Sequence, residues 1–147
     1  MKILITGGAG YVGSVLTNAA LGKGCNVRVI DSLYFDSKVP LINLSNPNYE
    51  FSRLDMSEKE NVAPLLEGVD YIVHTAAIVG EPASNKFPEL TEKTNYAAAK
   101  EIIGLAAKQG VKGFVFLSTC SNYGITEGLA KEDGGLKPLS LYADTKV

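Results

Sequence analysis

This sequence of 147 residues has only two cysteines, no long apolar run and a small net charge. Its two cysteines, Cys25 and Cys120, form no CxxC or CxxH pattern, so neither a disulfide framework nor a zinc site is expected. No apolar run approaches membrane-spanning length, and a first strand from Lys2 leaves no room for a signal peptide. The net charge of −2 gives no electrostatic reason to bind nucleic acid or an anionic membrane. These absences favour a soluble, cytoplasmic protein without a bound metal ion.

The sequence does contain enough apolar residues for one substantial core. With 46% hydrophobic and 20% charged residues, we expect one globular domain over residues 1–147. No internal repeat, linker or low-complexity segment divides the chain.

The start of the chain carries its most informative pattern. Residues 2–6 are a short, partly β-branched apolar run typical of a buried strand, and apolar residues at helical spacing follow Gly13. Between them, Gly7, Gly10 and Gly13 lie three residues apart. This spacing suits a tight turn, close approach of the backbone to a pyrophosphate, and a close contact between helix and strand. The free N–H groups of the helix N-terminus would then face the phosphates.

An acidic residue follows the next strand at the spacing expected for a dinucleotide site. The run over residues 26–30 ends at Asp31, about 20 residues beyond the turn, where a carboxylate can accept hydrogen bonds from the adenosine ribose. Asp31 is followed by Ser32 and not by an arginine, which favours NAD over NADP. In the long polar loop that comes next, Tyr34 and Phe35 are expected either to flank an adenine or to pin the loop to the surface.

The rest of the chain alternates between short apolar runs and helical patterns. Further strands are expected over residues 49–54, 69–74 and 111–117, with an irregular segment over 78–88 and a helix over 89–109. Five strands that alternate with helices predict a doubly wound, Rossmann-type α/β fold. Its parallel sheet has the order 3-2-1-4-5, and its ligand lies at the carboxyl ends of the strands.

Two helical segments carry local signals. Ser57 and Glu60 match a capping box, which predicts a helix from Ser57, although Pro64 predicts a kink or a late start near Asn61. In the helix over 89–109, apolar residues from Tyr96 onward cover an arc of roughly 200°, which predicts one face against the sheet and another against a helix or a second subunit.

Polar residues near the end of the chain suggest proton-transfer chemistry. If Tyr142 opens a helix, Lys146 shares its face, and an ammonium near a phenol lowers the phenol pKa. Tyr142 could then accept a proton from a substrate hydroxyl, with Thr119 bonding the same oxygen. Asn95 is expected to be a buried structural amide that needs partners, and the single histidine, His74, to be held by local hydrogen bonds.

In combination, these motifs resemble the extended short-chain dehydrogenase/reductases, and among them the NAD-dependent nucleotide-sugar epimerases and dehydratases. The resemblance rests on the following residues: Thr6 to Gly13, Asp31, Asp55, His74 to Ala77, Asn95, Ser118-Thr119 with Tyr123-Gly124, and Tyr142-x-x-x-Lys146.

The resemblance implies a site for NAD and a catalytic group of Thr119, Tyr142 and Lys146. Asp55 and Met56 would meet the adenine and Ala76 the nicotinamide half. The full set of expected NAD-binding residues is Gly7, Gly10, Tyr11, Val12, Gly13, Asp31, Ser32, Asp55, Met56, Thr75, Ala76, Ala77, Asn95 and Ser118. A nucleotide sugar would be the substrate, and a homodimer or another self-association is expected.

Two departures from the family pattern qualify the expected activity. Dehydratases of this kind carry an Asp-Glu pair after the catalytic threonine, whereas Cys120 and Ser121 stand here, so 4,6-dehydration is not expected. Family members run to about twice this length, so the chain is expected to be truncated before the substrate domain, with Lys146 poorly held. The alternatives are therefore an epimerase, a reductase or dehydratase of the same family, and a cofactor-binding fragment without turnover.

Overall fold

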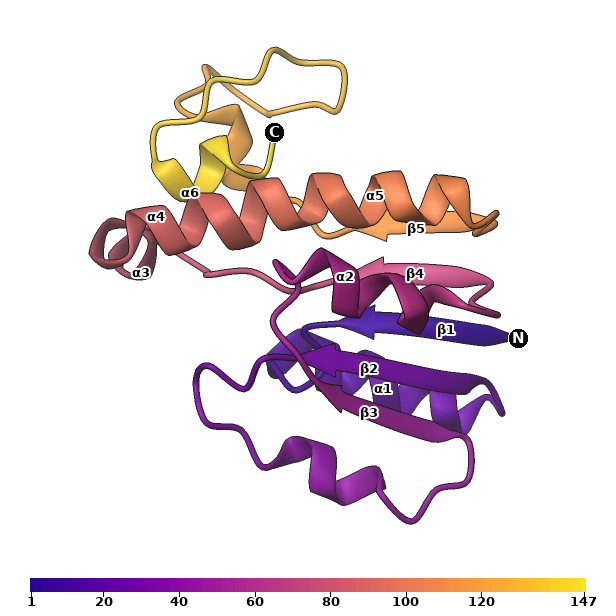
Figure 1. The fold of residues 1–147 in the computed structure, drawn as a ribbon. Helices are drawn as coiled ribbons and strands as arrows, with labels where there is room; N and C mark the ends of the chain where they lie inside the picture. Colours follow the sequence, from indigo (N-terminus) through magenta and orange to yellow (C-terminus); the bar gives the residue numbers. More distant parts are fainter. The chain divides into compact units, whose positions relative to one another are not determined.

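A parallel sheet of five strands forms the centre of the computed structural model, which describes residues 1–147 (Figure 1). The strands lie in the order β3-β2-β1-β4-β5, as the sequence predicts, and every neighbouring pair is parallel. Their bounds are β1 Lys2–Thr6, β2 Asn26–Asp31, β3 Tyr49–Arg53, β4 Tyr71–His74 and β5 Gly113–Phe116. Because the strands are parallel, their carboxyl ends share one edge of the sheet.

Helices cover both faces of this sheet. Successive residues of a strand point to opposite faces, so Leu4 and Ile5 of β1 belong to two different clusters of buried side chains. Ile5 lies in the cluster packed by Leu16 and Ala20 of α1 (Tyr11–Gly22). Leu4 lies in the larger cluster, with side chains of α2 (Lys59–Val62), the 3-10 helix η2 (Ala63–Leu66) and α5 (Ala98–Lys108).

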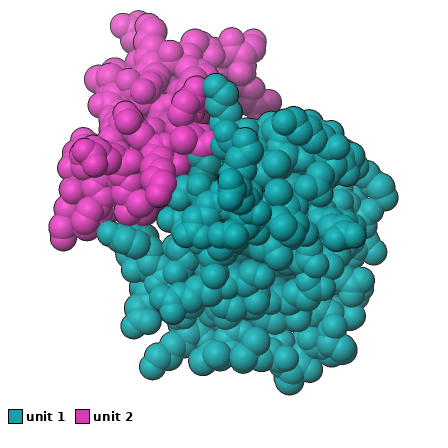
Figure 2. All heavy atoms as spheres, in the orientation of Figure 1, with its two compact units in different colours: residues 1–76, 98–117 teal, residues 77–97, 118–147 magenta.

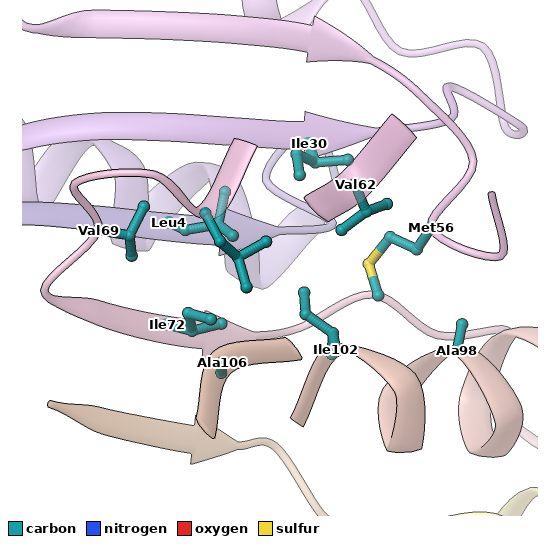
Figure 3. Packing of buried hydrophobic residues seen from close by; sticks show 10 residues of the cluster. Leu4, Ile30, Met56, Val62, Val69, Ile72, Ala98, Ile102 and Ala106 are labelled. Carbon is teal, nitrogen blue, oxygen red and sulfur yellow. The ribbon is translucent and has the colours of Figure 1, made fainter. Parts of the chain in front are cut away.

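The larger cluster shows why these helices pack where they do. Ile30 and Ile72 from the sheet meet Val62 and Ile102 from the helices, and all four are almost fully buried (Figure 3). Replacing a buried isoleucine such as Ile102 with alanine costs about 2–5 kcal/mol through lost burial and a cavity. The prediction that one face of this helix packs against the sheet is therefore confirmed, whereas Ile103, on the other side of α5, is exposed.

The capping box expected at Ser57 is wrong. The N–H and hydroxyl of Ser57 both donate to the Asp55 carboxylate, at 2.9 and 2.8 Å, so this serine closes a turn after β3 instead of capping a helix. The helix begins at Lys59 and changes to the 3-10 form at Ala63, next to Pro64. The interruption at the proline agrees with the expected kink, whereas the alternative of a start near Asn61 is wrong and the turn at Asp55 was not predicted.

The segment over residues 78–88 is not irregular. Residues Glu81–Lys86 form α3, and α4 follows at Pro88–Thr91, because a proline is tolerated in the first turn of a helix. The predicted helix over 89–109 is present but changes type within itself. A π-helical segment, η3 (Glu92–Ala97), connects α4 to α5 in the sequence.

The chain divides into two compact units (Figure 2). Unit 1 comprises Met1–Ala76 and Ala98–Leu117, and contains the whole sheet with α1, α2 and α5. Unit 2 comprises Ala77–Ala97 and Ser118–Val147. In it, α6 (Leu141–Asp144) contacts α3, α4 and the short 3-10 helix η4 (Cys120–Tyr123). None of the helices combines the length and the apolar character that crossing a membrane requires.

Candidate active site

The glycine turn of unit 1 is built so tightly that two of its glycines cannot be replaced. Gly7 has a φ of +71°, and a Cβ there would lie 2.6 Å from the Cα of Ala76. A Cβ on Gly13 would overlap the carbonyl oxygen of Gly7 and lie 2.7 Å from the Cα of Gly8. These contacts hold the turn between β1, the segment after β4, and α1.

Gly8 is a further requirement of the turn that the three-residue spacing did not reveal. A Cβ at this position would lie 2.5 Å from Cγ1 of Val29 on β2. The need for glycine at this position comes from a residue of the neighbouring strand, so no local sequence pattern could have predicted it.

The N-terminus of α1 is open toward solvent. Gly10 is the N-cap residue, no side chain caps the helix, and its first turn has no acidic residue. The first two residues, Tyr11 and Val12, are 91% and 46% exposed. The unpaired N–H groups and the positive end of the helix dipole are therefore available to an anion such as a pyrophosphate.

Asp31 lies at the end of β2, beside this turn. One oxygen of its carboxylate, Oδ2, accepts the N–H of Ala9 at 3.0 Å, and the other, Oδ1, accepts the N–H of Leu33 at 2.8 Å. Each carboxylate oxygen keeps a second lone pair, so the group can still accept hydrogen bonds from ribose hydroxyls. Ser32, the next residue, is exposed and its hydroxyl accepts the N–H of Tyr34.

The loop after Asp31 is attached to the glycine turn by Ser37, whose hydroxyl donates to the carbonyl oxygen of Ala9 at 2.9 Å. Tyr34 and Phe35 contact each other edge to face, with ring centroids 5.1 Å apart, and both are exposed. The two roles predicted for them thus remain predictions.

Two more strand ends contribute expected residues. Thr75 donates its hydroxyl to the carbonyl oxygen of Thr6 at 2.7 Å, which joins the ends of β1 and β4. Asp55 is engaged by Ser57, as described above. The side chain of Met56 is 6% exposed and lies in the larger core cluster, so only its main chain remains for contact with an adenine.

The residues of unit 1 together fit a dinucleotide. The crowded turn at Gly7 and Gly13 leaves only backbone near an incoming pyrophosphate, the N-terminus of α1 is open, and Asp31 supplies an acceptor for the ribose. Gly10 is exposed, and a Cβ there would meet only the oxygen of Gly7, at 3.2 Å.

In unit 2, Asn95 has the buried structural role that the sequence predicts. Its side-chain oxygen accepts the N–H of Ile78 at 2.8 Å, and its Nδ2 donates to the Ile78 carbonyl at 3.0 Å. The same nitrogen lies 3.2 Å from Oγ1 of Thr145, which donates to the carbonyl of Tyr142. Asn95 therefore connects Ile78, which follows the half-buried Ala77, to Thr145 at the end of α6.

Lys146 is held firmly, contrary to the expectation from its short helix. The residue is 3% exposed, and its carbonyl oxygen accepts Nδ2 of Asn122 and the hydroxyl of Ser118, both at 3.0 Å. Burial lowers the pKa of the Lys146 ammonium to about 8. The expectation failed because it considered the helix alone and not its contacts with the segment after β5.

The helix that carries Tyr142 begins one residue earlier than Tyr142, and its cap was missed. The hydroxyl of Ser140 accepts the N–H of Ala143 at 3.2 Å, which is an ordinary serine N-cap. The helix ends at Asp144, and the N–H of Lys146 bonds to the carbonyl of Ala143, three residues back. The N–H of Thr145 bonds to the carbonyl of Leu141, four residues back, and a face shared by Tyr142 and Lys146 stays a prediction.

A hollow of about 550 Å³ in unit 2 brings two of the three expected catalytic residues together. Thr119 and Lys146 both line it, and Tyr142 is not among its lining residues. The full lining is Ser118, Thr119, Cys120, Asn122, Tyr123, Leu136, Lys146 and Val147. The hydroxyl of Thr119 donates to Oγ of Ser121 and accepts the N–H of Ser121, each at 3.3 Å.

The chain is similar in sequence to curated enzymes that act on nucleotide sugars. The chain is 39% identical to UDP-glucuronic acid decarboxylase 1 of Arabidopsis thaliana over 126 residues, which is 84% of this chain and 27% of that protein. It is 38% identical over 159 residues to an uncharacterized UDP-glucose epimerase of Bacillus subtilis, covering 100% of this chain and 49% of that protein. The chain thus spans between a quarter and a half of the length of these curated relatives.

A solved structure extends the likeness to three dimensions. A dTDP-glucose 4,6-dehydratase of Streptomyces venezuelae, determined with NAD bound, superposes with a TM-score of 0.92 at 31% identity, over 99% of this chain and 48% of that one. The profile of the NAD dependent epimerase/dehydratase family matches residues 3–147. On the strength of the glycine turn, Asp31 and this match, the chain belongs to the NAD-dependent epimerase/dehydratase family.

Proposed function

We propose that this protein is an epimerase of nucleotide sugars, in which residues of unit 1 hold NAD and Thr119, Tyr142 and Lys146 act on a sugar hydroxyl. The observation that carries the proposal is in unit 2. Thr119 and Lys146 line one hollow, and the two residues that follow Thr119 have no carboxylic acid. NAD, when bound, would accept a hydride from the sugar carbon and return it to the opposite face of that carbon, which inverts the stereocentre.

Tyr142 is the residue proposed to take the proton of the substrate hydroxyl. A phenol does this best as the phenolate, and a positive charge nearby favours that form. Lys146 can supply this charge, because a group with a pKa of about 8 is still mostly protonated at neutral pH.

Thr119 is proposed to bond the same substrate oxygen. Its present bonds to Ser121 are long, at 3.3 Å, so a substrate oxygen can replace them at small cost. Thr119 is half-buried, which leaves its hydroxyl accessible from the hollow.

The chemistry of Cys120 and Ser121 favours epimerisation over dehydration. Elimination of water needs an acid beside the leaving hydroxyl and a base beside the neighbouring C–H. Dehydratases of the resembling family carry an Asp-Glu pair at these two positions, where this chain has a thiol and a hydroxyl. Beyond the hydride transfer that NAD would supply, epimerisation needs only the group that removes and returns the hydroxyl proton.

The proposal is tested on protein expressed from the complete natural reading frame, incubated with UDP-glucose, UDP-glucuronic acid or dTDP-glucose. Mass spectrometry and NMR of the products separate the reactions. An epimer keeps the mass of the substrate, a dehydratase product has lost one water, and a decarboxylase product has lost one carbon dioxide. An epimer is expected, and Tyr142→Phe should remove most of the activity, on the order of a hundredfold or more.

Two outcomes would replace the proposal. A product lighter by one water would identify a dehydratase, and one lighter by carbon dioxide a decarboxylase. Tyr142→Phe with unchanged turnover would remove Tyr142 from the mechanism even if an epimer forms.

A further inference from the structure

We propose that Asn122 is the positioning residue that fixes Lys146 within the hollow of unit 2. No motif singled out this asparagine, and its effect on catalysis, though not its effect on Lys146, rests on the proposed function. Asn122 is 5% exposed and lies in η4, directly after the segment that carries Thr119.

The side chain of Asn122 closes a triangle of hydrogen bonds around the main chain of Lys146. Its Nδ2 donates to the Lys146 carbonyl at 3.0 Å and to the hydroxyl of Ser118 at 2.8 Å. The Ser118 hydroxyl donates to the same Lys146 carbonyl, also at 3.0 Å. The carbonyl of Lys146 is thereby fixed from two sides by residues that follow β5.

The main chain of Asn122 makes a third connection. Its carbonyl oxygen accepts the N–H of Lys137 at 2.8 Å. Asn122 therefore joins the segment after β5, at Ser118, to two later parts of the chain: Lys137, at the base of the loop over 125–136, and Lys146, which ends the Tyr-x-x-x-Lys motif.

The remaining atom of the Asn122 amide indicates that its role is position rather than stability. Oδ1 is buried and has no hydrogen-bond partner. A buried acceptor without a donor costs free energy on folding, and an apolar side chain of the same size would avoid that cost. What an apolar side chain could not supply is the pair of N–H bonds that hold Ser118 and Lys146.

Fixing the main chain of Lys146 keeps its side chain out of water. Burial is the cause of the low pKa of Lys146, so releasing its carbonyl should let the ammonium reach solvent and raise the pKa toward its ordinary value. The other titratable groups that line the hollow are the Cys120 thiol and the Tyr123 phenol, and Tyr142 and Asp144 lie on α6.

The test measures the pKa of Lys146 by NMR of its ε-methylene group in the protein from the complete reading frame, with the signal assigned from Lys146→Arg. Asn122→Leu keeps the volume and removes the donors, and Ser118→Ala removes the second bond to the carbonyl. A rise of roughly one pH unit is expected for Asn122→Leu and a smaller rise for Ser118→Ala. Ser140→Ala is the matched control, because it removes the cap of α6 without touching the Lys146 carbonyl.

Each outcome decides the proposal. A Lys146 pKa that stays at its parent value in folded Asn122→Leu overturns it, and so does a rise of equal size in Ser140→Ala. If Asn122→Leu does not fold, Ser118→Ala decides alone, with a rise supporting the proposal and no rise overturning it. Where an epimerase assay succeeds, kcat should fall in Asn122→Leu while KM is unchanged. The pKa measurement stands even if that assay finds no activity.

Discussion

The carboxylate of Asp31 accepts the main-chain N–H of Ala9 at 3.0 Å, so the acid at the end of β2 is bonded directly to the glycine turn that we expect to hold a pyrophosphate. The bond joins two parts of the expected NAD site that are 22 residues apart in sequence. Neither part needs to be ordered by the ligand, which reduces the entropy lost on binding.

Cofactor choice follows from this arrangement. A carboxylate at the ribose accepts hydrogen bonds from hydroxyls and repels a 2′-phosphate, so NAD should bind at least about tenfold more tightly than NADP. Calorimetric titration with both dinucleotides measures the ratio. Asp31→Ser should weaken the binding of NAD and reduce the difference in affinity between NAD and NADP. Tighter binding of NADP than of NAD by the parent protein would contradict the assignment.

Two glycines of α1 provide a matched pair. Gly13→Ala places a methyl group against the backbone of Gly7 and Gly8, which cannot move aside, so NAD affinity should fall by more than tenfold and the melting temperature should drop. Gly22→Ala adds a methyl group with no atom within 4 Å and should stabilise the chain by roughly 0.5 kcal/mol without changing NAD affinity. Equal effects of the two substitutions on NAD affinity would show that the crowding at Gly13 does not determine that affinity.

The buried Lys146 predicts a pH dependence of stability. Its pKa in the folded state is about 8, below the ordinary 10.5, so between these values the unfolded chain binds more protons and stability rises with pH. Below about pH 8 the cost of burying the ammonium is fully present. Urea denaturation between pH 7.5 and 9.5 should show the parent gaining stability relative to Lys146→Met, by at most about 1.4 kcal/mol per pH unit. A constant difference across that range would contradict the low pKa.

Self-association remains a prediction with two testable surfaces in unit 1. Ile103 on α5 is 46% exposed, and Val115 on the edge strand β5 is 54% exposed. Exposed apolar side chains on a helix face and an unpaired strand edge both favour contact with another chain. Sedimentation at micromolar concentration should show association that Ile103→Lys or Val115→Lys weakens. A monomer at all concentrations would rule the prediction out.

The strands, their order and the glycine turn could be predicted because their signals are local and repeated. Apolar runs such as residues 2–6 and 26–30 are too short for helices, and the alternation with helices leaves few topologies. Prediction from local patterns failed at Ser57. The hydroxyl of this serine donates to the Asp55 carboxylate and does not cap a helix. Such prediction also failed over residues 78–88, where Pro82 lies in the first turn of a helix that begins at Glu81.

The hollow of unit 2 was harder to predict because its contacts join distant segments. Thr119, Tyr142 and Lys146 could be named from motifs, whereas the burial of Lys146 depends on Ser118 and Asn122, more than twenty residues earlier. No spacing rule connects an asparagine after β5 to the carbonyl of a lysine near the end of α6. Such a contact becomes visible only when the chain is folded.

The two residues that flank the loop over residues 125–136, Gly124 and Lys137, lie next to each other. The carbonyl of Asn122 bonds the N–H of Lys137 at 2.8 Å, and a side chain at Gly124 would collide with the carbonyl of Lys137. Since the ends of the loop are joined below it, its length is nearly independent of the rest of unit 2. Doubling a flexible loop costs only about 0.6 kcal/mol in closure entropy. Within residues 125–135, none of which lines the hollow, an inserted peptide or a fluorophore tag should therefore leave Thr119 and Lys146 undisturbed.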